Sequence, residues 1–411
     1  MQLDKTQQVA VDLIAMMERL VLITGGPGRG KSFAIEHAIQ RLYNQGVRPH
    51  EIALAAPTGK AAQRVTEQTK NIIDSEAKTI HRLLEFNPAM GWGRNKTSPL
   101  DQKVIICDEA SMVDSPLLSR LMHACKPEAS LVLVGDADQL PPVGAGNPFQ
   151  DLILHSDKPV ARLSINHRQA EGSLIAHNAD LILSGRMPEF GTPGGHRLGG
   201  RLEDDMFHIP IIDKEAVTEA IFQVADQVKG EDLVILTPQN KNLLGSEDLN
   251  ISMQEKYNPE KPGGYQLKLS PTFTLRENDP VIHCKNNYKL GVFNGEVGAV
   301  VSIDTSDKTI LVQYPDKQIT YDWANAHDLK LAYSITIHKS QGSEYRNVIL
   351  VCHSTHSFML DRSLVYTAIT RAKHRLWVIG DGKGLARAVR NTKSRQRNTY
   401  LKDHYQRGVR V

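Results

Sequence analysis

The chain has 411 residues, which is enough for two or three domains, and its 40% hydrophobic and 23% charged residues are typical of a folded globular protein. The formal net charge of +3 excludes a strongly basic surface over the whole chain, so that any nucleic-acid footprint must be local. The stretch 387–411 carries eight Lys or Arg residues against one acid, Asp403. This pattern favours a solvated helix and tail over a nucleic-acid contact.

The cysteines and the N-terminus bear on the cellular compartment. Cys107 lies in the apolar run VIIC and is expected to be a buried thiol, and the absence of any CxxC pair fits a reducing environment. Cys352, His353 and His356 are close in sequence, but without a second cluster of ligands a structural role is favoured over zinc. The start MQLDKTQQ has no apolar signal segment and no run is long enough to span a membrane. We therefore expect a cytoplasmic protein with no membrane contact.

Strand-like apolar runs alternate with helix-like segments along the chain. The runs are 21–24, 51–57, 103–109 and 130–136, and then 232–238, 347–353 and 375–381. This alternation predicts an α/β fold with two lobes, each a parallel sheet covered by helices. The stretch 184–210, rich in Gly, Pro and charge, predicts an irregular surface segment between the lobes.

Two further stretches break the α/β alternation. Residues 271–330 contain short alternating runs interrupted by Asn-Gly, Asp and Pro, which predicts a small β-barrel inserted in the second lobe. Residues 86–101 are too irregular for a helix. They predict either a hairpin with Trp92 near its tip or a simple surface loop.

The sequence GGPGRGKS at 25–32 follows a strand-like run and precedes a helix-like segment, which is the pattern of a P-loop. Glycines let backbone N–H groups point at phosphate oxygens, and the helix N-terminus adds its positive dipole. We expect Lys31 to reach the β- and γ-phosphates and the Ser32 hydroxyl to ligate Mg²⁺. Arg29 stands where no special backbone angle is required, and whether it touches the nucleotide stays open. The predicted nucleotide-binding residues of the loop are Gly25, Gly26, Pro27, Gly28, Arg29, Gly30, Lys31 and Ser32.

Polar residues follow the next strand-like runs. Asp108 and Glu109 end the run in ICDEAS, where Asp108 suits the Mg²⁺ shell and Glu109 suits orienting or deprotonating the attacking water. Gln139, in GDADQLPP, is placed to sense the γ-phosphate. Arg168 in NHRQ and Arg371 in YTAITRAK are candidate arginine fingers, each worth roughly 10³–10⁵ in rate. Taken singly, either arginine fits a surface ion pair as well, but the accompanying motifs favour the finger.

The motifs together resemble one family. In chain order they are LDKTQQVA, GGPGRGKS, AAPTGKAAQRV, TIHRLL, DEAS, GDADQLPP, NHRQ, VFNGEVG, TIHKSQGSE and YTAITRAK. The set resembles the RecD-type DNA helicases of superfamily 1, and also Dda-type phage helicases and the helicase part of conjugative relaxases. The resemblance implies two RecA-like lobes. Their expected bounds are 1–165 for lobe 1A with a pin hairpin 1B near 86–101, 166–270 and 331–411 for lobe 2A, and 271–330 for an SH3-like β-barrel 2B.

The resemblance also implies ATP-driven movement 5′ to 3′ along single-stranded DNA, with Mg²⁺ as cofactor, and separation of duplex DNA at junctions. By position, Gln7 would read the adenine edge, Glu344 would contact the ribose, and Gln139, Arg168 and Arg371 would sense the γ-phosphate. The residues expected along the DNA path are Pro57, Thr58, Thr79, His81, Thr336, His338 and Lys339. Trp92, if it forms the pin tip, would stack on the last base pair, worth about 1–3 kcal/mol.

Two departures and three alternatives accompany this interpretation. The family usually has Thr where Arg29 stands, and the chain begins at the adenine-reading motif, so it resembles a bare helicase core. One alternative is a DNA-stimulated ATPase subunit that remodels or loads a repair, recombination or replication partner without unwinding. A second is a nuclease–helicase, whose nuclease would be on a partner chain because no acidic cluster follows Arg371. RNA as the track is the third.

Overall fold

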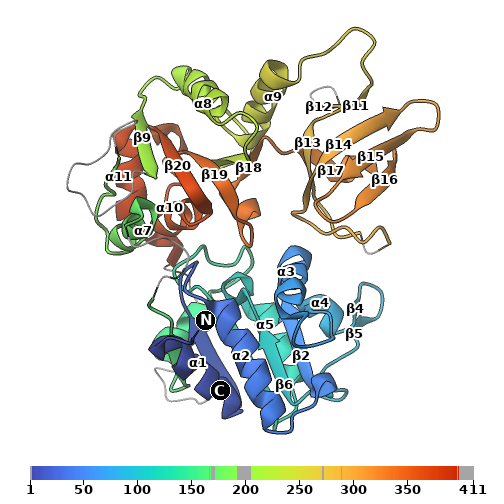
Figure 1. The fold of residues 1–411 in the computed structure, drawn as a ribbon, viewed down its shortest axis with the longest axis vertical. Helices are drawn as coiled ribbons and strands as arrows, with labels where there is room; N and C mark the ends of the chain where they lie inside the picture. The colour runs from blue at the N-terminus through green and yellow to red at the C-terminus, as the bar shows by residue number, and fades with distance from the viewer. Residues whose placement is uncertain are drawn as a thin grey trace. The chain divides into compact units, whose positions relative to one another are not determined.

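The protein, seen here in a computed structural model, is described over residues 2–165, 167, 172–191, 205–270, 273–287, 289–395 and 397. It forms two compact units, residues 1–170 with 392–411, and residues 171–391 (Figure 1). The expected bounds assigned 331–411 to the second lobe, but the described residues from Thr392 on group with the first unit. There the Arg397 guanidinium donates to the carbonyl oxygens of Gly144 and Gly146, at 2.7 and 3.2 Å.

A parallel sheet forms the centre of the first unit. Its order is β3 (Lys78–Thr79), β2 (Ile52–Ala56), β6 (Val104–Cys107), β7 (Ser130–Gly135), β1 (Leu20–Thr24) and β8 (Val160–Arg162). Helices α1 (Lys5–Ala15), α2 (Lys31–Asn44) and α3 (Gly59–Thr69) cover one face, and α4 (Ile80–Leu83), α5 (Ser115–Ala124) and α6 (Pro148–His155) cover the other. Strands β1, β2, β6 and β7 are buried along their whole length, because both of their faces meet helices.

The second unit has the same architecture. Its parallel sheet runs in the order β18 (Ser334–Thr336), β10 (Leu233–Thr237), β19 (Tyr345–Val351), β20 (Ala372–Gly380) and β9 (Met206–Pro210). Helices α8 (Ala216–Gln227) and α9 (Ser246–Tyr257) pack on one face. Helices α7 (Leu174–Leu183), α10 (Arg362–Ile369) and α11 (Gly382–Arg390) lie together on the other face (Figure 1).

An antiparallel β-domain, here called the β-insertion (residues 266–331), interrupts the second unit between α9 and β18. Its sheet runs in the order β16 (Gln318–Asp322), β15 (Thr309–Gln313), β14 (Val297–Asp304), β13 (Pro280–His283) and β17 (Leu329–Leu331), with a separate pair β11 (Gln266–Ser270) and β12 (Phe273–Arg276). It has its own core, in which the hydroxyls of the buried Tyr314 and Tyr321 are hydrogen-bonded at 2.7 Å. The expected α/β fold with a β-structured insertion in the second lobe is confirmed.

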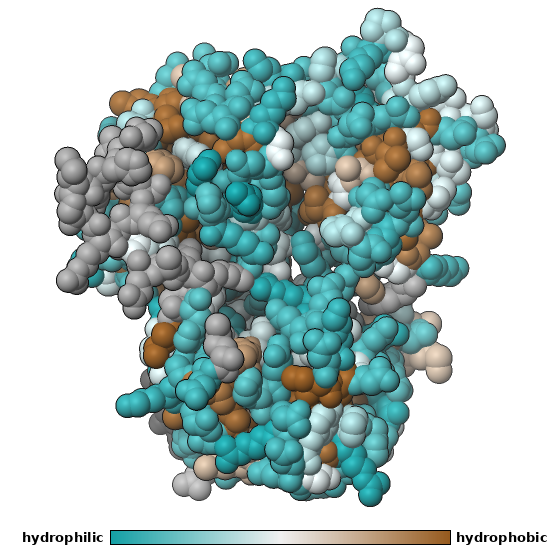
Figure 2. All heavy atoms as spheres, viewed as in Figure 1, coloured by the Kyte–Doolittle hydropathy of each residue, from teal (hydrophilic) through white to brown (hydrophobic). Residues whose placement is uncertain are grey.

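The segment between the lobes is only partly irregular. Residues 206–210, predicted to be irregular, form the edge strand β9, which pairs in parallel with β20. Residues 192–204 lie outside the described residues. Figure 2 shows hydrophilic residues over most of the visible face, with separate small apolar patches. Within the described ranges, no helix combines the length and the hydropathy needed to cross a bilayer.

Candidate functional site

The loop between β1 and α2 has the geometry that the P-loop pattern predicts. Gly28 and Gly30 both have a φ of 74°, in the left-handed region that glycine enters without steric cost. Gly30 caps α2, so that Lys31 and Ser32 open the helix, where backbone N–H groups have no intrahelical acceptor. A Cβ at Gly30 would collide with the side-chain amide of Gln7, so the close approach of the loop to α1 also requires glycine.

The two cations of the loop have different partners. The ammonium of Lys31 donates to the carbonyl oxygens of Gly25 and Gly26, at 2.7 and 3.1 Å, and so lies against the phosphate-binding turn. Arg29 instead reaches the segment after β8, where its Nη1 donates to the carbonyl oxygen of Ser164 at 2.7 Å. In the structure, this arginine therefore ties the loop to the segment that leads toward Arg168.

Gln7 lies at the start of α1, in a capping box with Asp4. Asp4 Oδ1 accepts from the backbone N–H of Gln7 at 2.9 Å, and Gln7 Oε1 accepts from the backbone N–H of Asp4 at 3.1 Å. Asp4 Oδ2 also lies 2.6 Å from Nε2 of His167. Burial raises the pKa of Asp4, but hydrogen bonds from Thr6, Gln7 and His167 outweigh it and lower the pKa to about 2. These contacts fix Gln7 next to the P-loop, where adenine reading is expected.

The two predicted acidic residues follow β6. Burial and the neighbouring charge of Glu109 raise the pKa of Asp108 to about 6, whereas the charges of Lys31 and Arg64 lower it. Asp108 Oδ1 accepts from the backbone N–H of Glu109 at 2.8 Å. Glu109 has φ 52° and ψ 36°, a left-handed conformation that is uncommon outside glycine and that clusters at functional sites. The short helix η2 (Ala110–Met112) follows this turn.

Gln139 lies in the turn that follows β7, at the same sheet edge as the P-loop. The backbone N–H of Gly25 donates to the carbonyl oxygen of Gly135 at 3.1 Å, which joins the ends of β1 and β7. Gln139 is 6% exposed, and its Nε2 donates to Asp136 Oδ2 at 3.2 Å. Its Oε1 is buried and has no hydrogen-bond partner in the described part of the chain. A buried unpaired acceptor is costly, which fits a site that takes in a polar ligand.

Arg371, in the second unit, is 2% exposed and hydrogen-bonded by all three guanidinium nitrogens. Nε donates to the carbonyl oxygen of Thr367 at 3.0 Å, Nη1 to that of Ser343 at 3.1 Å, and Nη2 to the hydroxyl of Thr370 at 3.2 Å. The predicted finger is thus held by α10 and by the loop before β19. This loop also carries Glu344, which pairs with Lys373 at 3.7 Å. Arg168, the other predicted finger, lies outside the described residues.

Three threonines predicted on the DNA path have the same local role. Thr58, directly after Pro57, and Thr79 and Thr336 each follow or end a strand and cap the helical turn that comes next. Their hydroxyl oxygens accept from the backbone N–H three residues ahead, at 3.2, 3.1 and 3.4 Å. Each threonine is therefore fixed at the carboxyl end of a sheet strand.

The triplet Thr-Ile-His occurs once in each unit, at corresponding places. In the first unit it joins the edge strand β3 to α4, and in the second it joins the edge strand β18 to η4 (Ile337–Ser340). Ile80 and Ile337 are both fully buried, which anchors each turn, and His81 and His338 follow directly. In the second unit the next residue, Lys339, donates from Nζ to the sulfur of Cys284 on the β-insertion at 3.6 Å.

Residues 86–92 form a hairpin, β4 (Phe86–Asn87) with β5 (Gly91–Trp92), but Trp92 does not lie at its tip. Trp92 pairs with Phe86 across the hairpin, with ring centroids 4.6 Å apart, and lies 5.3 Å from the ring of His81. The turn is residues 88–90, and Met90 there is 87% exposed. The expectation of a Trp92 tip is wrong because the aromatic rings pack together near the base, leaving the small turn to smaller or unbranched residues.

The two histidines of the Cys-His group at 352–356 lie against backbone carbonyl oxygens. His353 Nε2 lies 3.1 Å from the carbonyl oxygen of Ile212, and His356 Nε2 lies 3.4 Å from that of Leu243. Among the residues that the structure describes, no cluster of three or more His, Cys, Asp or Glu side chains could hold a metal ion.

Comparison with known proteins identifies the family. Residues 7–145 match the AAA domain family, 249–314 match the ATP-dependent RecD-like DNA helicase SH3 domain, and 331–379 match the UvrD-like helicase C-terminal domain. The RecBCD enzyme subunit RecD of Mycobacterium tuberculosis is 30% identical over 414 residues, covering 92% of this chain and 69% of that protein. The chain belongs to the RecD family of helicases. The resemblance inferred from the sequence motifs is confirmed.

Two further proteins are similar to this RecD-type chain, one in sequence and one in fold. The ATP-dependent RecD2 DNA helicase of Deinococcus radiodurans is 34% identical over 400 residues, covering 97% of this chain but 52% of that protein. The chain thus spans about half the length of that relative. A Bacteroides Pif1 bound to single-stranded DNA shares the fold, with a TM-score of 0.56 at 18% identity, covering 99% of this chain and 97% of the other. The β-insertion contains much of the region that matches the SH3 family.

The residues of the first unit fit a nucleotide and a divalent cation. Ser32 and Asp108 offer the hydroxyl and carboxylate oxygens that Mg²⁺ prefers, and Lys31 is close enough to Asp108 to lower its pKa. Sequence reasoning missed the contributions of Asp4, Arg64 and His167. The Asp-x-x-Gln spacing of the capping box could have indicated Asp4. The pair of Asp4 with His167 joins residues 163 positions apart, and no local pattern predicts it.

Proposed function

We propose that this chain is an ATP-dependent DNA helicase that moves 5′ to 3′ on single-stranded DNA and separates duplex DNA at junctions. One observation carries the proposal: a P-loop with Lys31, the acidic pair after β6 and the buried Gln139 occupy one edge of a RecA-like sheet in a RecD-type chain. The names of its relatives, which include an ATP-dependent DNA helicase, support the coupling of this site to DNA.

Each residue of the nucleotide site has a proposed task. The Ser32 hydroxyl and the Asp108 carboxylate would hold Mg²⁺, which neutralises phosphate charge when bound. Lys31 binds phosphate oxygens, and Glu109 orients the attacking water and accepts its proton. Gln139 senses the γ-phosphate through its buried amide. The remaining proposed contacts are Gln7 to the adenine edge, Glu344 to the ribose, the other residues of the loop 25–32 to the phosphates, and Arg168 and Arg371 as fingers.

The DNA path is proposed to use both units. Pro57, Thr58, Thr79 and His81 would grip the DNA backbone from the first unit, and Thr336, His338 and Lys339 from the second. Threonine hydroxyls and backbone amides bind phosphates without reading bases, so the track would be independent of sequence. If nucleotide binding brings Arg168 and Arg371 to the γ-phosphate, the two grips alternate with each cycle of hydrolysis, and alternate gripping produces directed steps.

The first test is ATP hydrolysis with and without single-stranded DNA. Wild type should be strongly stimulated, and Lys31→Ala should lose turnover while still binding single-stranded DNA. Lys70→Ala, at an exposed residue after α3, is the matched control and should behave as wild type. Retained turnover in Lys31→Ala would refute the assignment of the loop. Duplexes with a 5′ or a 3′ single-stranded tail then test polarity, since only the 5′ tail should support unwinding.

A second candidate function is supported by the RecBCD subunit among the relatives. In it, the chain is a DNA-stimulated ATPase that loads or remodels a repair or recombination partner and does not unwind alone. The two functions differ in one assay. Stimulated hydrolysis without unwinding of a tailed duplex by the purified chain would favour the partner-dependent function. Replacing the DNA tail with RNA tests whether the track is selective for the sugar.

A further inference from the structure

Helix α9 carries a buried ladder of amide side chains. Asn250 and Gln254, and Asn258 at the C-cap of the helix, recur at intervals of four residues and therefore lie along one side of it. They are only 7, 4 and 9% exposed. Burying amides is unfavourable unless each finds hydrogen-bond partners, so this face must meet matching polar groups. The partners are found on two segments at the base of the β-insertion, here called the entering linker (Phe273–Asp279, which contains β12) and the leaving linker (Leu331–Ser334).

Asn250 holds the linker by which the chain leaves the β-insertion. Its Nδ2 donates to the carbonyl oxygens of Leu331 and Ser334, at 3.1 and 2.9 Å. Its Oδ1 accepts from the backbone N–H of Ser334 at 2.8 Å. One side chain thus uses both its donor and its acceptor ends on the last residue of β17 and the first residue of β18.

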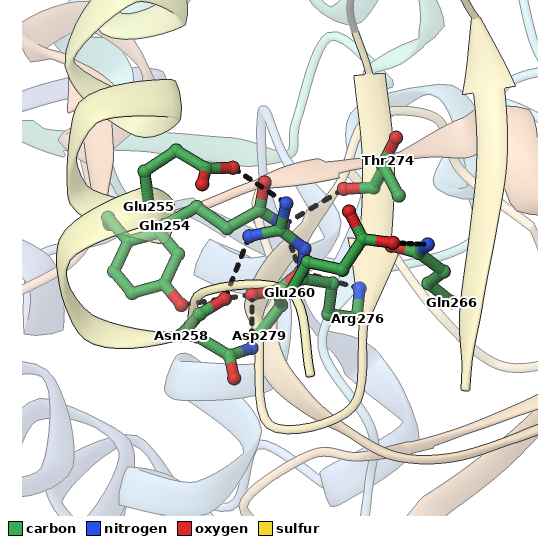
Figure 3. Close-up of polar contacts among 9 residues, drawn as sticks. Gln254, Glu255, Asn258, Glu260, Gln266, Thr274, Arg276 and Asp279 are labelled. Carbon is green, nitrogen blue, oxygen red and sulfur yellow. Dashed lines mark hydrogen bonds and ion pairs between the residues drawn. The ribbon is translucent and has the colours of Figure 1, made fainter. Parts of the chain in front are cut away.

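Gln254 and Asn258 hold the linker by which the chain enters the β-insertion sheet. Gln254 Nε2 donates to the carbonyl oxygen of Thr274 at 2.9 Å, and Asn258 Nδ2 donates to that of Glu277 at 2.8 Å. Figure 3 shows both amides directed from the helix toward the strand that carries Thr274 and toward Asp279. The same helix face therefore binds the entering and the leaving linker.

Asp279 closes the network. It is fully buried, and its carboxylate accepts from Gln254 Nε2 at 2.5 Å and from Asn258 Nδ2 at 2.8 Å (Figure 3). It also accepts from the backbone N–H of Arg276 at 2.7 Å and from the Tyr333 hydroxyl at 2.9 Å. Burial raises the pKa of Asp279, and these donors act against that rise. Tyr333 belongs to the leaving linker and Arg276 to the entering one, so both linkers and α9 meet at one carboxylate.

Arg276 completes the attachment from the side of the β-insertion. Its Nη1 donates to the carbonyl oxygen of Asn258 at 2.8 Å, and its Nη2 lies 2.6 Å from Glu255 Oε1 (Figure 3). Donors therefore run in both directions across the junction. The buried Nε of Arg276 has no hydrogen-bond partner among the described residues. Hydrogen bonds require particular directions, whereas apolar contacts allow sliding, so a polar network of this kind fixes orientation.

The strand that starts at this network ends at the predicted DNA path. Asp279 directly precedes β13 (Pro280–His283), and the next residue, Cys284, accepts through its sulfur from Nζ of Lys339. A strand of four residues spans about 13 Å and is stiff because its neighbours in the sheet hold it. A change of orientation at Asp279 would therefore be transmitted to the position of Cys284 beside Lys339.

We propose that Asn250, Gln254, Asn258 and Asp279 are positioning residues, which hold the SH3-like β-insertion in one orientation on the second unit so that the two move as one body on the DNA. The link to DNA rests on the proposed function. Any rearrangement during the ATP cycle then occurs outside this junction, and the contact of Cys284 with Lys339 persists through the cycle. Single-stranded DNA bound along the predicted path would contact the second unit and the β-insertion as one continuous surface.

Fluorescence transfer between two dyes in the second unit tests the orientation directly. The dyes are attached through unnatural amino acids at the exposed Ser306, in the turn between β14 and β15, and the exposed Lys383, on α11, so that the native cysteines stay unchanged. Wild type should give one narrow distribution that does not move when a non-hydrolysable ATP analogue and oligothymidine are added. A distribution that splits or shifts with these ligands would overturn the proposal.

Two variants and one control isolate the network. Asp279→Asn keeps the shape of the side chain but replaces one accepting oxygen with an NH₂ group, which is itself a donor and faces the surrounding donors. Tyr333→Phe removes only the hydroxyl donor. Loss of one such hydrogen bond changes the equilibrium between orientations of the β-insertion by about fivefold. Both should broaden the distribution, and both should unwind fewer base pairs per ATP with an unchanged KM for ATP. Ile251→Ala, a 45% exposed neighbour on α9, should match wild type. If Asp279→Asn does not fold, Tyr333→Phe carries the test.

The two proposals fail in different ways. A distribution that remains narrow in both network variants would refute the positioning role, whatever the enzyme activity. A proportional loss of hydrolysis and unwinding in Tyr333→Phe would equally refute it, because a merely structural defect reduces both. Absence of DNA-stimulated hydrolysis in wild type would refute the helicase function, while the width of the distribution would still decide the rigidity of the junction.

Discussion

Replacing Trp92 with alanine distinguishes the function of the base of the hairpin from that of its tip. The Trp92 ring packs against Phe86 and His81, with centroids 4.6 and 5.3 Å apart. Each aromatic pair contributes about 0.5–1.5 kcal/mol, so loss of the two pairs removes about 1–3 kcal/mol before the lost burial is counted. For a unit of this size the melting temperature falls by about 2–4 °C per kcal/mol, and we expect a decrease of about 5 °C.

The Trp92→Ala variant should also lose function in a characteristic way. His81, predicted on the DNA path, would lose a stacking partner, so DNA-stimulated hydrolysis and unwinding should fall together. Met90→Ala is the matched comparison, because Met90 is 87% exposed at the tip and makes little contribution to stability. It should leave melting and stimulated hydrolysis unchanged and reduce unwinding alone.

The assay is therefore a pair of measurements, hydrolysis with single-stranded DNA and unwinding of a 5′-tailed duplex, made on both variants with a thermal melt. Selective loss of unwinding in Trp92→Ala, with an unchanged melting temperature, would refute a purely packing role of Trp92 at the base of the hairpin. It would indicate that the tryptophan itself separates the DNA strands. Normal unwinding by Met90→Ala would show that the tip does not meet the duplex.

Three further substitutions test the first unit. Arg29→Thr removes an exposed hydrogen bond to Ser164, worth about 0.5–1 kcal/mol, so the KM for ATP should rise about two- to fivefold. Arg29→Lys should reverse part of this rise, and an unchanged KM in Arg29→Thr would show that the contact is irrelevant to ATP binding. Because the pKa of Asp4 is lowered to about 2, its contribution to stability is present above the unfolded pKa near 4 and is lost as the pH falls toward 2. The difference in melting temperature between wild type and Asp4→Asn should therefore shrink from pH 5 to pH 2.5, and a constant difference would contradict this. Gly30→Ala places an alanine in a left-handed backbone conformation and makes its Cβ collide with Gln7. Nucleotide affinity measured by titration should therefore fall clearly while the melting temperature changes little, and an unchanged affinity would refute the need for glycine.

Features set by local chemistry could be predicted from the sequence. The P-loop follows from glycines at two left-handed positions, and the buried parallel strands follow from continuous apolar runs. The sequence indicates that Asp108 and Gln139 follow strands that end at one sheet edge, because the carboxyl ends of parallel strands share an edge whatever the details of the helices, and β6 and β7 are parallel neighbours. These inferences needed no knowledge of distant contacts.

Features set by distant contacts could not be predicted. Strand β9 lies in a stretch whose composition indicates an irregular segment, and only its pairing with β20 makes it a strand. The sequence of α9 shows no clear apolar face, because its buried residues include the polar Ser246, Asn250 and Gln254 beside the apolar Leu249 and Met253. Asn250 is buried by partners more than eighty positions later in the chain. The position of Trp92 likewise depended on which residues could bury one another around the hairpin.

The repeated Thr-Ile-His triplet links sequence, fold and proposed mechanism. In both units the triplet lies where an edge strand passes into a helical turn, with the isoleucine buried and the threonine capping the turn. A threonine hydroxyl that accepts the capping hydrogen bond keeps its own hydrogen as a donor, which suits a phosphate oxygen. Two units with the same grip could step along a uniform backbone without reading it. What differs between them is what stands beside each triplet: the aromatic hairpin packs on His81, and the β-insertion contacts Lys339. The asymmetry needed to separate strands would then come from the insertions, and the shared geometry of the two turns would supply only the movement.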